Sequence, residues 1–572
     1  MAGDNVLFFG DNLAILRKPE YFPDASADLI YLDPPFSSGR DYNVLFTETN
    51  GKDSGAQKEA FTDTWHWDMA AASAFDDAVR SGGPGVAAAM EAFKTLLGES
   101  DMMAYLSMMA PRLVELRRVL RPTGSIYLHC DPTASHYLKL LMDSVFGPAN
   151  FRNEIIWQRS TGKANQTVRL PTNHDIILAY GNGGATFWNH AASFQAYDPE
   201  NLDEKTASKY THHDADGRVY RLDSLISPNP DRPNLIYEFL GVTKVWRWTK
   251  ERMLKAYEDG LVVQTGKGKV PQFKRYLESS KGRPLGDVWT DIPPLNSQAQ
   301  ERLGYPTQKP EALLERIIEL SSPRGGTVLD PFCGCGTTIA AAQGLGRRWV
   351  GIDITYLAIG LVERRLKAAF GPEVAKGWTV IGQPTTVTEA TALASRDRYQ
   401  FQWWVLDCLD AWSRDNARKK GADQGIDGLI NFQESPGGKV RTILIQVKSG
   451  GVHRGDVATL SGDMSREGAA IGALVTLEPT TEPMRKEAAS AGFYEPEDPI
   501  GAGGPKYPKI QLLSIADILE GGRKIEFPEK GNVTFRQAPP APKVQTGRVK
   551  QLTEATPAEP TTSPTLKQDR TE

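Results

Sequence analysis

Residues 327–354 read TVLDPFCGCGTTIAAAQGLGRRWVGIDI, and this stretch decides the fold. TVLD predicts a short strand that ends at Asp330, the glycines that follow predict a tight turn, and TTIAAAQGL predicts a helix. RRWVGIDI predicts a second strand that carries Asp353 near its end. A strand, a glycine turn, a helix and a second strand are the repeating unit of a parallel sheet with crossover helices.

The N-terminal part of the chain has the same rhythm. VLFFG at 6–10, DLIYLD at 28–33 and SIYLHC at 125–130 predict strands, and a long amphipathic helix is expected from about residue 101. We therefore expect an α/β fold with a doubly wound, mainly parallel, Rossmann-like sheet built from residues 1–150 and 301–372. Residues 151–300 interrupt the rhythm and are expected to form an inserted region.

The rest of the chain divides into a linker at 373–398, a second, smaller α/β domain at 399–529, and a disordered tail at 530–572, where prolines and polar residues replace large apolar ones. Hydrophobic content of 40% allows sizeable cores. No apolar run is long enough for a membrane-spanning helix, so no membrane partner is expected. Four cysteines in 572 residues favour a reducing, cytoplasmic location.

The tetrapeptide Asp33-Pro34-Pro35-Phe36 directly follows a predicted strand. Two prolines end the strand's hydrogen-bonding ladder and hold the chain rigid. The Asp33 carboxylate and the Pro34 carbonyl are then two fixed acceptors at the carboxyl end of the sheet, where α/β proteins bind ligands. Two acceptors suit the two hydrogens of a planar exocyclic amino group, and Phe36 offers a ring for stacking. A strand-end turn with a surface Phe is the alternative.

The glycine-rich turn at 330–338 predicts a second site. Its glycines allow a ligand to approach the backbone, and an acid at the end of the next strand, Asp353, is placed to accept from ribose hydroxyls. The third glycine of a pyrophosphate loop is missing, and Asp330 puts negative charge where a phosphate would lie. The turn is therefore expected to bind an amino group rather than a phosphate. The alternative is an isolated glycine-rich turn that binds no ligand.

Six motifs in order carry a resemblance to a known family: G-D-N at 10–12, Y-L-D-P-P-F at 31–36, F-T-D-T-W-H-W at 61–67, L-R-P-T-G-S-I-Y-L-H-C-D at 120–131, Y-P-T-Q-K-P at 305–310 and L-D-P-F-C-G-C-G-T-T at 329–338. Over about residues 5–370 the chain resembles DNA amino-methyltransferases of the class in which D-P-P-F precedes the glycine-rich motif. The resemblance implies S-adenosylmethionine as methyl donor and double-stranded DNA as partner. It also implies target recognition by the insert at 151–300. A homodimer is left open.

The resemblance also implies roles for single residues. Asp33, Pro34, Pro35 and Phe36 would hold the extruded target base. The donor would be bound by a second set: Asp11, Thr307, Gln308, Lys309, Asp330, Phe332, Gly334, Gly336, Thr337 and Asp353. Within that set Asp330 would bind the methionine end, Asp353 the ribose and Asp11 the adenine. An Asp as the first residue of D-P-P-F favours adenine N6, with cytosine N4 as the alternative.

The insert contains a basic, aromatic stretch. Residues 241–290 hold 11 Lys or Arg against 5 Asp or Glu, interleaved with aromatic residues such as Trp246 and Trp248. Such a stretch fits a recognition segment, with cations for phosphates and polar side chains for base edges. A solvated charged face is the alternative. The net charge of −4 means that DNA contact must come from a local patch.

The C-terminal domain carries Asp427 before one strand and Gln446 and Lys448 on one face of the next. This pattern resembles the Mrr-like branch of the restriction-endonuclease fold, in which Q-x-K replaces E-x-K. The resemblance implies Mg²⁺ held by Asp427 and Gln446, with Lys448 at the scissile phosphate. We therefore expect a DNA adenine methyltransferase with an endonuclease-like domain, as in restriction–modification. One alternative is a methyltransferase whose C-terminal domain binds DNA without cleaving it. The other is a DNA-binding protein in which both the methyltransferase site and the nuclease site are inactive.

Overall fold

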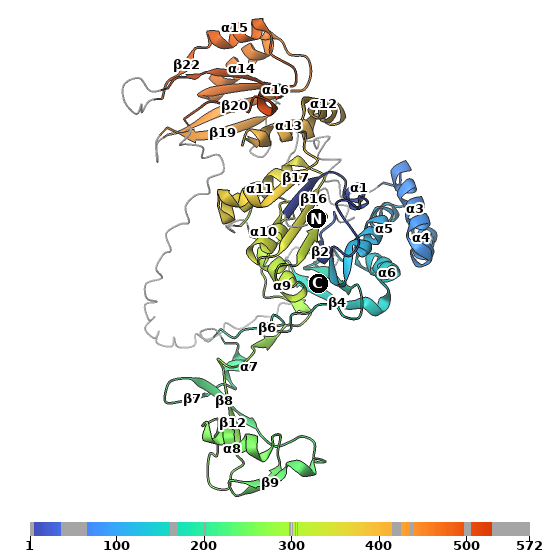
Figure 1. Ribbon diagram of the computed structural model, residues 1–572, viewed down its shortest axis with the longest axis vertical. Helices are drawn as coiled ribbons and strands as arrows, with labels where there is room; N and C mark the ends of the chain where they lie inside the picture. Colours follow the sequence, from blue (N-terminus) through green and yellow to red (C-terminus); the bar gives the residue numbers. More distant parts are fainter. Residues whose placement is uncertain are drawn as a thin grey trace, which may run out of the picture.

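The computed structural model describes residues 5–35, 66–160, 170–198, 202–296, 299, 301–303, 305, 307–413, 425–434, 439–496 and 505–528. Figure 1 shows three bodies in a row: a central α/β domain, a lobe formed by part of the insert, and a C-terminal domain on the opposite side. None of the described helices is long and apolar enough to cross a membrane.

The central domain is built on a nine-stranded sheet. Its strands, in spatial order, are β14 (Val288–Trp289), β4 (Phe151–Gln158), β5 (His174–Gly181), β3 (Leu120–Cys130), β2 (Ala27–Leu32), β15 (Thr327–Asp330), β16 (Arg348–Asp353), β1 (Asn5–Phe9) and β17 (Trp378–Ile381). The six strands from β3 to β17 are mutually parallel, whereas β5 is antiparallel to β3 and β4. The doubly wound, mainly parallel sheet is thus confirmed.

Helices cover both faces of this sheet because side chains alternate along each strand. Leu29 and Tyr31 of β2 pack in the core under α9 (Glu311–Ser321), α10 (Thr337–Gly344) and α11 (Tyr356–Phe370). Ile30 and Leu32 pack in the core on the other face. That face is covered by α1 (Asn12–Leu16), α3 (Met69–Ser81), α4 (Gly83–Leu97), α5 (Asp101–Val119) and α6 (Ser135–Phe146).

Only part of the range 151–300 leaves the central domain, because β4, β5 and β14 continue the main sheet. The separate lobe begins with the pair β6 (Phe194–Gln195) and β13 (Arg283–Pro284). Beyond that pair lie α7 (Glu204–Ala207), β7 (His212–His213), β8 (Val219–Ser224), β9 (Ile236–Phe239), β10 (Val242–Val245), α8 (Lys250–Glu258), β11 (Val262–Val263) and β12 (Gln272–Tyr276).

The C-terminal domain has a five-stranded sheet in the order β18 (Trp412–Ser413), β19 (Gly428–Gln433), β20 (Val440–Lys448), β21 (Ile471–Thr476) and β24 (Ile510–Ser514). Its other elements are α14 (Arg454–Glu467), α15 (Glu482–Ser490), β22 (Phe493–Tyr494), β23 (Tyr507–Pro508) and α16 (Ile515–Leu519). The range 373–398 holds the edge strand β17 and α12 (Val387–Arg396), and α13 (Arg398–Cys408) follows. Figure 1 shows α12 and α13 between the two sheets.

Candidate active site

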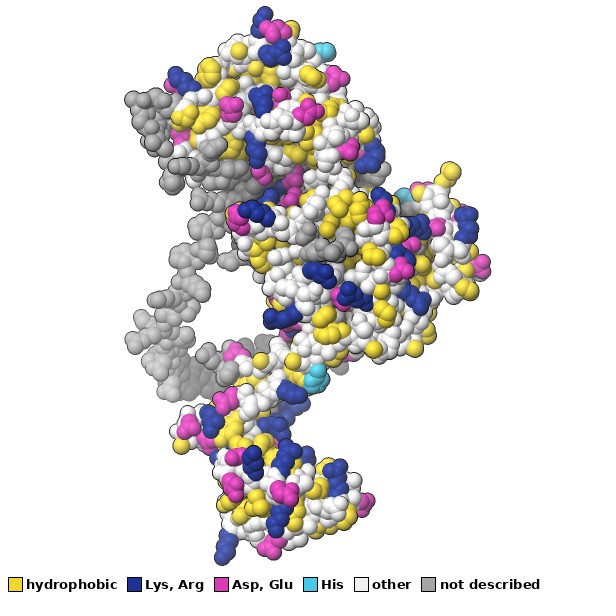
Figure 2. Space-filling view, in the orientation of Figure 1, with side chains coloured by type: hydrophobic (Ala, Val, Ile, Leu, Met, Phe, Trp, Pro, Cys, Tyr) yellow, Lys and Arg dark blue, Asp and Glu magenta, His cyan; other side chains and the backbone are white. Residues whose placement is uncertain are grey.

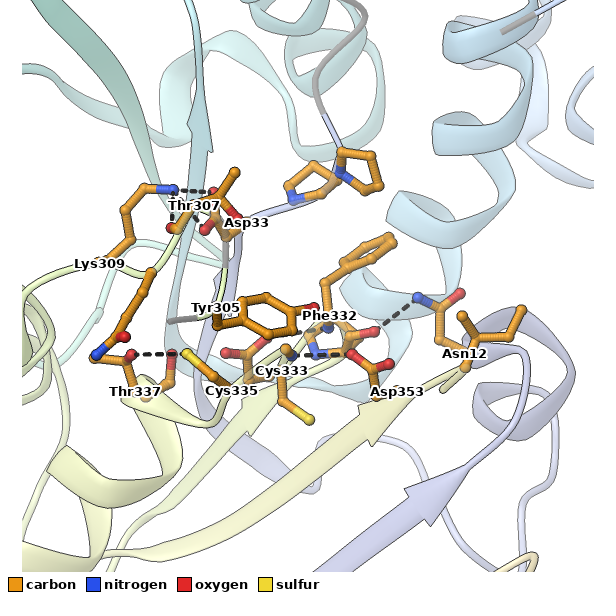
Figure 3. Close-up of a pocket in the computed structure, with 18 of the residues that line it drawn as sticks. Asn12, Asp33, Tyr305, Thr307, Lys309, Phe332, Cys333, Cys335, Thr337 and Asp353 are labelled. Atoms are coloured by element: carbon orange, nitrogen blue, oxygen red, sulfur yellow. Dashed lines mark hydrogen bonds and ion pairs between the residues drawn. The ribbon is translucent and has the colours of Figure 1, made fainter. Parts of the chain in front are cut away.

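One pocket lies at the carboxyl ends of β1, β2, β15 and β16, the edge at which parallel sheets bind ligands (Figure 3). It brings together segments that are almost 300 residues apart in the sequence. Its lining includes Gly10, Asp11, Asn12, Asp33, Pro34, Pro35, Met108, Arg112, Tyr305, Thr307, Gln308, Lys309, Asp330, Pro331, Phe332, Cys333, Gly334, Cys335, Thr337, Thr338, Asp353 and Ile354. The proline corner and the glycine turn therefore face the same space.

Asp33 is held by an ion pair with Lys309. The Lys309 Nζ atom lies 2.8 Å from Oδ1 and 2.6 Å from Oδ2 of Asp33, and it also donates to the Thr307 carbonyl at 3.3 Å. The Lys309 side chain is 8% exposed and that of Asp33 is 18% exposed, so the pair is poorly screened by water. The ion pair fixes the plane of the Asp33 carboxylate at the pocket wall (Figure 3).

Asp330 is a buried carboxyl group at the end of β15. Its Oδ1 accepts a hydrogen bond from the Phe332 backbone N–H at 3.0 Å. The pKa of Asp330 is raised to about 7, chiefly by burial and also by the nearby carboxylates of Asp33 and Asp353, while hydrogen bonds oppose the shift. Asp330 is therefore poised between its neutral and charged forms near neutral pH.

Asp353 ends β16 and is tied to two backbone segments. Its Oδ2 accepts from Gly334 N at 2.9 Å, and its Oδ1 accepts from both Thr355 N and Thr355 Oγ1 at 2.9 Å. Burial also raises the pKa of Asp353. Gly334 has φ +49°, and a Cβ there would meet the Tyr305 ring at 3.2 Å. The turn needs glycine at this position for both reasons.

The far side of the pocket is closed by a chain of polar contacts. Arg112, from α5, donates to Asp11 Oδ2 and to Asn12 Oδ1, each at 2.6 Å. Asn12 Nδ2 donates in turn to the Pro331 carbonyl at 2.8 Å. Burial lowers the pKa of Arg112, opposed by Asp11. This chain joins α5 and α1 to the glycine turn.

The predicted site residues are thus brought together, with three differences in detail. The side-chain amide of Gln308 forms local hydrogen bonds: it accepts from Leu303 N at 2.8 Å and donates to the Glu301 carbonyl at 2.6 Å. Gly336 is absent from the lining; it is the N-cap residue that precedes α10, with φ +74°, and a Cβ there would meet Val362 at 2.7 Å. Phe36 lies outside the described residues.

Sequence reasoning missed Asn12 and Arg112 as parts of the pocket wall. Asn12 belongs to the G-D-N motif, which could have indicated it. Arg112 has no local signal because it is an ordinary position on an amphipathic helix. Cys333 and Cys335, which invite a metal interpretation, are buried side chains that line the turn.

The charges of the pocket are uneven. Asp11 pairs with Arg112 and Asp33 with Lys309, each at 2.6 Å. In the part of the chain that the structure describes, Asp330 and Asp353 form no ion pair. A buried carboxyl group, Asp330, and a partly buried one, Asp353, with no ion pair to a described residue suit a ligand that carries positive charge.

A sequence model of the DNA methylase family matches residues 27–360, which is more than half of the chain. The chain belongs to the DNA methylase family. A second model, described as NACHT-associated inactive restriction endonuclease 1, matches residues 404–512 of this methylase.

Three curated relatives are similar to the methylase. The type II methyltransferase M.EcaI of Enterobacter cloacae is 28% identical over 64% of this chain and 70% of its own. The Mod subunit of the type III restriction-modification enzyme StyLTI of Salmonella typhimurium is 27% identical over 60% of this chain, and the chain spans only 50% of its length. The DNA adenine methyltransferase YhdJ of Escherichia coli is 25% identical over 64% of this chain and 83% of its own.

Among solved structures, the PvuII DNA methyltransferase (cytosine-N4-specific) is 11% identical, with a TM-score of 0.32. The likeness covers 66% of this chain and 95% of that chain.

The lobe of the methylase uses the aromatic residues of 241–290 mainly as a core. Trp246 is fully buried, and Trp248 and Phe273 pack edge to face with ring centroids 5.0 Å apart. Some cations of this stretch are paired, since Lys274 contacts Asp214 at 2.8 Å and Arg275 contacts Asp223 at 2.5 Å. Figure 2 shows basic and acidic side chains mixed over the visible face of the lobe. The aromatic interleaving therefore reflects folding of the lobe.

In the described part of the C-terminal domain, the residues predicted to form the Mg²⁺ site bond to other protein groups. Gln446 is buried, and its Nε2 donates to Asp463 Oδ2 at 2.7 Å. Asp427 Oδ2 accepts from Val447 N at 2.6 Å. Among the described side chains, no group of three or more His, Cys, Asp or Glu could hold a metal ion. The geometry does not support the expectation that Asp427 and Gln446 hold Mg²⁺ beside Lys448.

Proposed function

We propose that the chain transfers a methyl group from S-adenosylmethionine to the N6 amino group of adenine in double-stranded DNA. The observation that carries the proposal is the single pocket lined by Asp33 and Pro34 on one side and by Asp330, Gly334 and Asp353 on the other. A pocket shared by an amine-binding corner and a nucleoside-binding turn is what transfer between two such groups requires.

The chemistry of the pocket fits the donor. S-adenosylmethionine supplies an electrophilic methyl group on a cationic sulfur. Asp330, the carboxyl group with the pKa raised to about 7, would accept from the ammonium of the methionine end, and Asp353 would accept from the ribose hydroxyls. The Gly334 backbone leaves room beside Tyr305. Arg112 and Asn12 would hold the Asp11 end of the pocket.

Asp33 and the Pro34 carbonyl would orient the target amine. Each would accept a hydrogen bond from one of the two N–H groups of the amine. These hydrogen bonds would fix the position of the nitrogen and stabilise the positive charge that develops on it. Lys309 keeps the Asp33 carboxylate in place, with both carboxylate oxygens within 2.8 Å of its Nζ. Each carboxylate oxygen has two lone pairs, so the ion pair leaves acceptor capacity for the base. The base must leave the duplex to reach this corner.

Two observations favour adenine over cytosine. First, the corner begins with Asp, and the resemblance associates this residue with adenine N6. Second, a relative that matches 64% of the chain is named a DNA adenine methyltransferase. Sequencing of modified bases in DNA from cells that express the chain tests this choice. N6-methyladenine at one recurring site is the expected result, whereas N4-methylcytosine would overturn the choice of base and unmodified DNA would overturn the activity.

For the C-terminal domain the observations favour a unit that does not cleave DNA. Gln446 is neutral and already donates to Asp463, and the family that matches 404–512 is described as inactive. Incubation of unmethylated plasmid with Mg²⁺, with and without the donor, should leave the plasmid intact while methyl groups are incorporated. Donor-independent nicking or linearisation would restore the combined restriction–modification enzyme.

A further inference from the structure

Helix α13 and the C-terminal domain that follows it, here called the C-terminal unit, contact the methylase at the start of α11, next to Asp353. Gln400 of α13 is buried, and its Oε1 accepts from the backbone N–H of Tyr356 at 3.0 Å. Tyr356 is the first residue of α11, and the first N–H groups of a helix have no acceptor within the helix. Gln400, which lies beyond the methylase sheet, therefore supplies the acceptor that the first N–H group of α11 lacks within its own helix.

The capped N–H lies next to the residues that hold Asp353. Thr355 precedes Tyr356 and donates to Asp353 Oδ1 through both its backbone N–H and its hydroxyl, at 2.9 Å each. The orientation of the Asp353 carboxylate therefore depends on the backbone at 355–356. Gln400 fixes that backbone from the other side.

A second contact leads from Tyr356 to the pocket. The Tyr356 ring stacks on Phe9 with centroids 3.6 Å apart, and Phe9 precedes Gly10, whose N–H donates to the Asp353 carbonyl at 2.9 Å. The start of α11 is thus tied to both strands that carry the far end of the pocket, β1 and β16.

Helices α11 and α13 are joined by an ion pair and by shared apolar packing. Arg364 of α11 contacts Asp407 of α13 at 2.8 Å. A Cβ on Gly360 would lie 2.3 Å from Asp407 Oδ1 and 3.1 Å from an Arg364 guanidinium nitrogen, so a larger residue there would displace this ion pair. Phe401 and Trp404 belong to the same buried cluster as Ile359 and Val362 of α11. The apolar core is continuous between the two units.

We propose that Gln400 of α13 is a positioning residue for the donor pocket, and that it orients Asp353 through Tyr356 and Thr355. The inference rests on the proposed donor site. Because coupling is reciprocal, a donor bound at Asp353 should also stabilise the docking of α13 on α11. Donor binding would then tighten the docking of the C-terminal unit, the unit that we propose does not cleave DNA.

Calorimetric titration of the full chain with S-adenosylhomocysteine, well below the melting temperature, tests the proposal. Gln400→Ala removes the acceptor and should weaken binding about 5- to 20-fold, the scale of one lost buried hydrogen bond. Gln400→Glu keeps an acceptor oxygen and should restore most of the affinity. Arg364→Gln, the control, removes one ion pair of the same interface two turns along α11 and leaves α13 docked through its apolar contacts; it should lower Tm and leave affinity unchanged.

A ligand without ribose hydroxyls separates positioning of Asp353 from general loosening of the fold. For the 2′,3′-dideoxy analogue of S-adenosylhomocysteine, wild type and Gln400→Ala should bind equally. Wild-type affinity of Gln400→Ala for the parent ligand, or an equal loss for both ligands, would overturn the positioning role. A wild-type chain that binds neither ligand would instead overturn the donor site, and the inference with it.

Discussion

The ammonium group of Lys309 contacts both carboxylate oxygens of Asp33, at 2.6 and 2.8 Å, although the two residues are 276 positions apart in the sequence. This ion pair joins the segment before α9 to the end of β2. The corner that we propose to bind the target amine is therefore a product of the tertiary fold.

Lys309→Met removes the cation and leaves a half-buried carboxylate without its partner. We expect the free energy of unfolding to fall by about 1–3 kcal/mol, since breaking a buried pair on one side leaves an uncompensated charge. We also expect kcat for methyl transfer to fall more than KM for DNA rises, because the loosened Asp33 acts in the transition state. Lys376→Met, at an exposed pair with Glu373, is the control and should change neither. Urea unfolding and steady-state kinetics measure both; unchanged kcat in Lys309→Met would contradict the assigned role.

Asp330→Asn should stabilise the ligand-free protein at alkaline pH. Burial raises the pKa of Asp330 to about 7, so the native state holds a proton that the unfolded chain, with an ordinary pKa of about 3.9, has released. The free energy of unfolding of the wild type therefore falls as pH rises from about 4 to about 7. Asparagine stays neutral, so the advantage of the variant should grow over this range. Urea unfolding at pH 5 and pH 8 measures it, and equal stabilities at pH 8 would contradict the burial argument.

The same residue should give donor binding a pH dependence of the opposite sign. An ammonium group is bound by the charged form of Asp330, so donor affinity of the wild type should rise as pH increases through about 7. Asp330→Asn should bind weakly and without this rise. Calorimetric titrations between pH 6 and pH 8.5 measure the slope; a wild-type affinity that falls with pH would argue against an ammonium at this position.

Gly334→Ala should weaken donor binding by about 10-fold or more. The added Cβ would lie 3.2 Å from the Tyr305 ring at a backbone φ of +49°, which narrows the pocket and strains the turn. Gly346→Ala is the matched control, because its φ is +66° but its Cβ would meet nothing within 4 Å. Both variants should lose about 1 kcal/mol of stability, and only Gly334→Ala should lose affinity. Equal affinities would place the donor elsewhere.

The sequence predicted the sheet because its strands are short apolar runs that end at turn residues. TVLD, WVGID and DLIYL each appear as parallel strands whose carboxyl ends meet at the pocket. Asp33, Asp330 and Asp353 could be found because each ends such a strand. This part of the site follows from local pattern and sheet geometry.

The rest of the site depends on packing that no local pattern encodes. Arg112 reaches Asp11 because α5 packs beside α1, and the two residues are 101 positions apart. Trp246 belongs to the stretch interpreted as a recognition segment, but composition does not tell that its ring is buried in the core of the lobe. Gln400 lies in a range read as the start of a separate domain, so its contact with Tyr356 depended on the docking of two units.

Single-turnover methyl transfer by Asp33→Ala and Asp33→Asn, at saturating donor and on unmethylated DNA that contains the target site, tests whether this corner holds the target base. Donor binding is measured by calorimetry alongside, since the far wall of the pocket is unchanged. We expect both variants to bind the donor and to transfer methyl groups at least about 100-fold more slowly than wild type, because orientation of the amine is lost. Transfer by Asp33→Ala at a rate close to wild type would contradict the claim that this corner holds the target base.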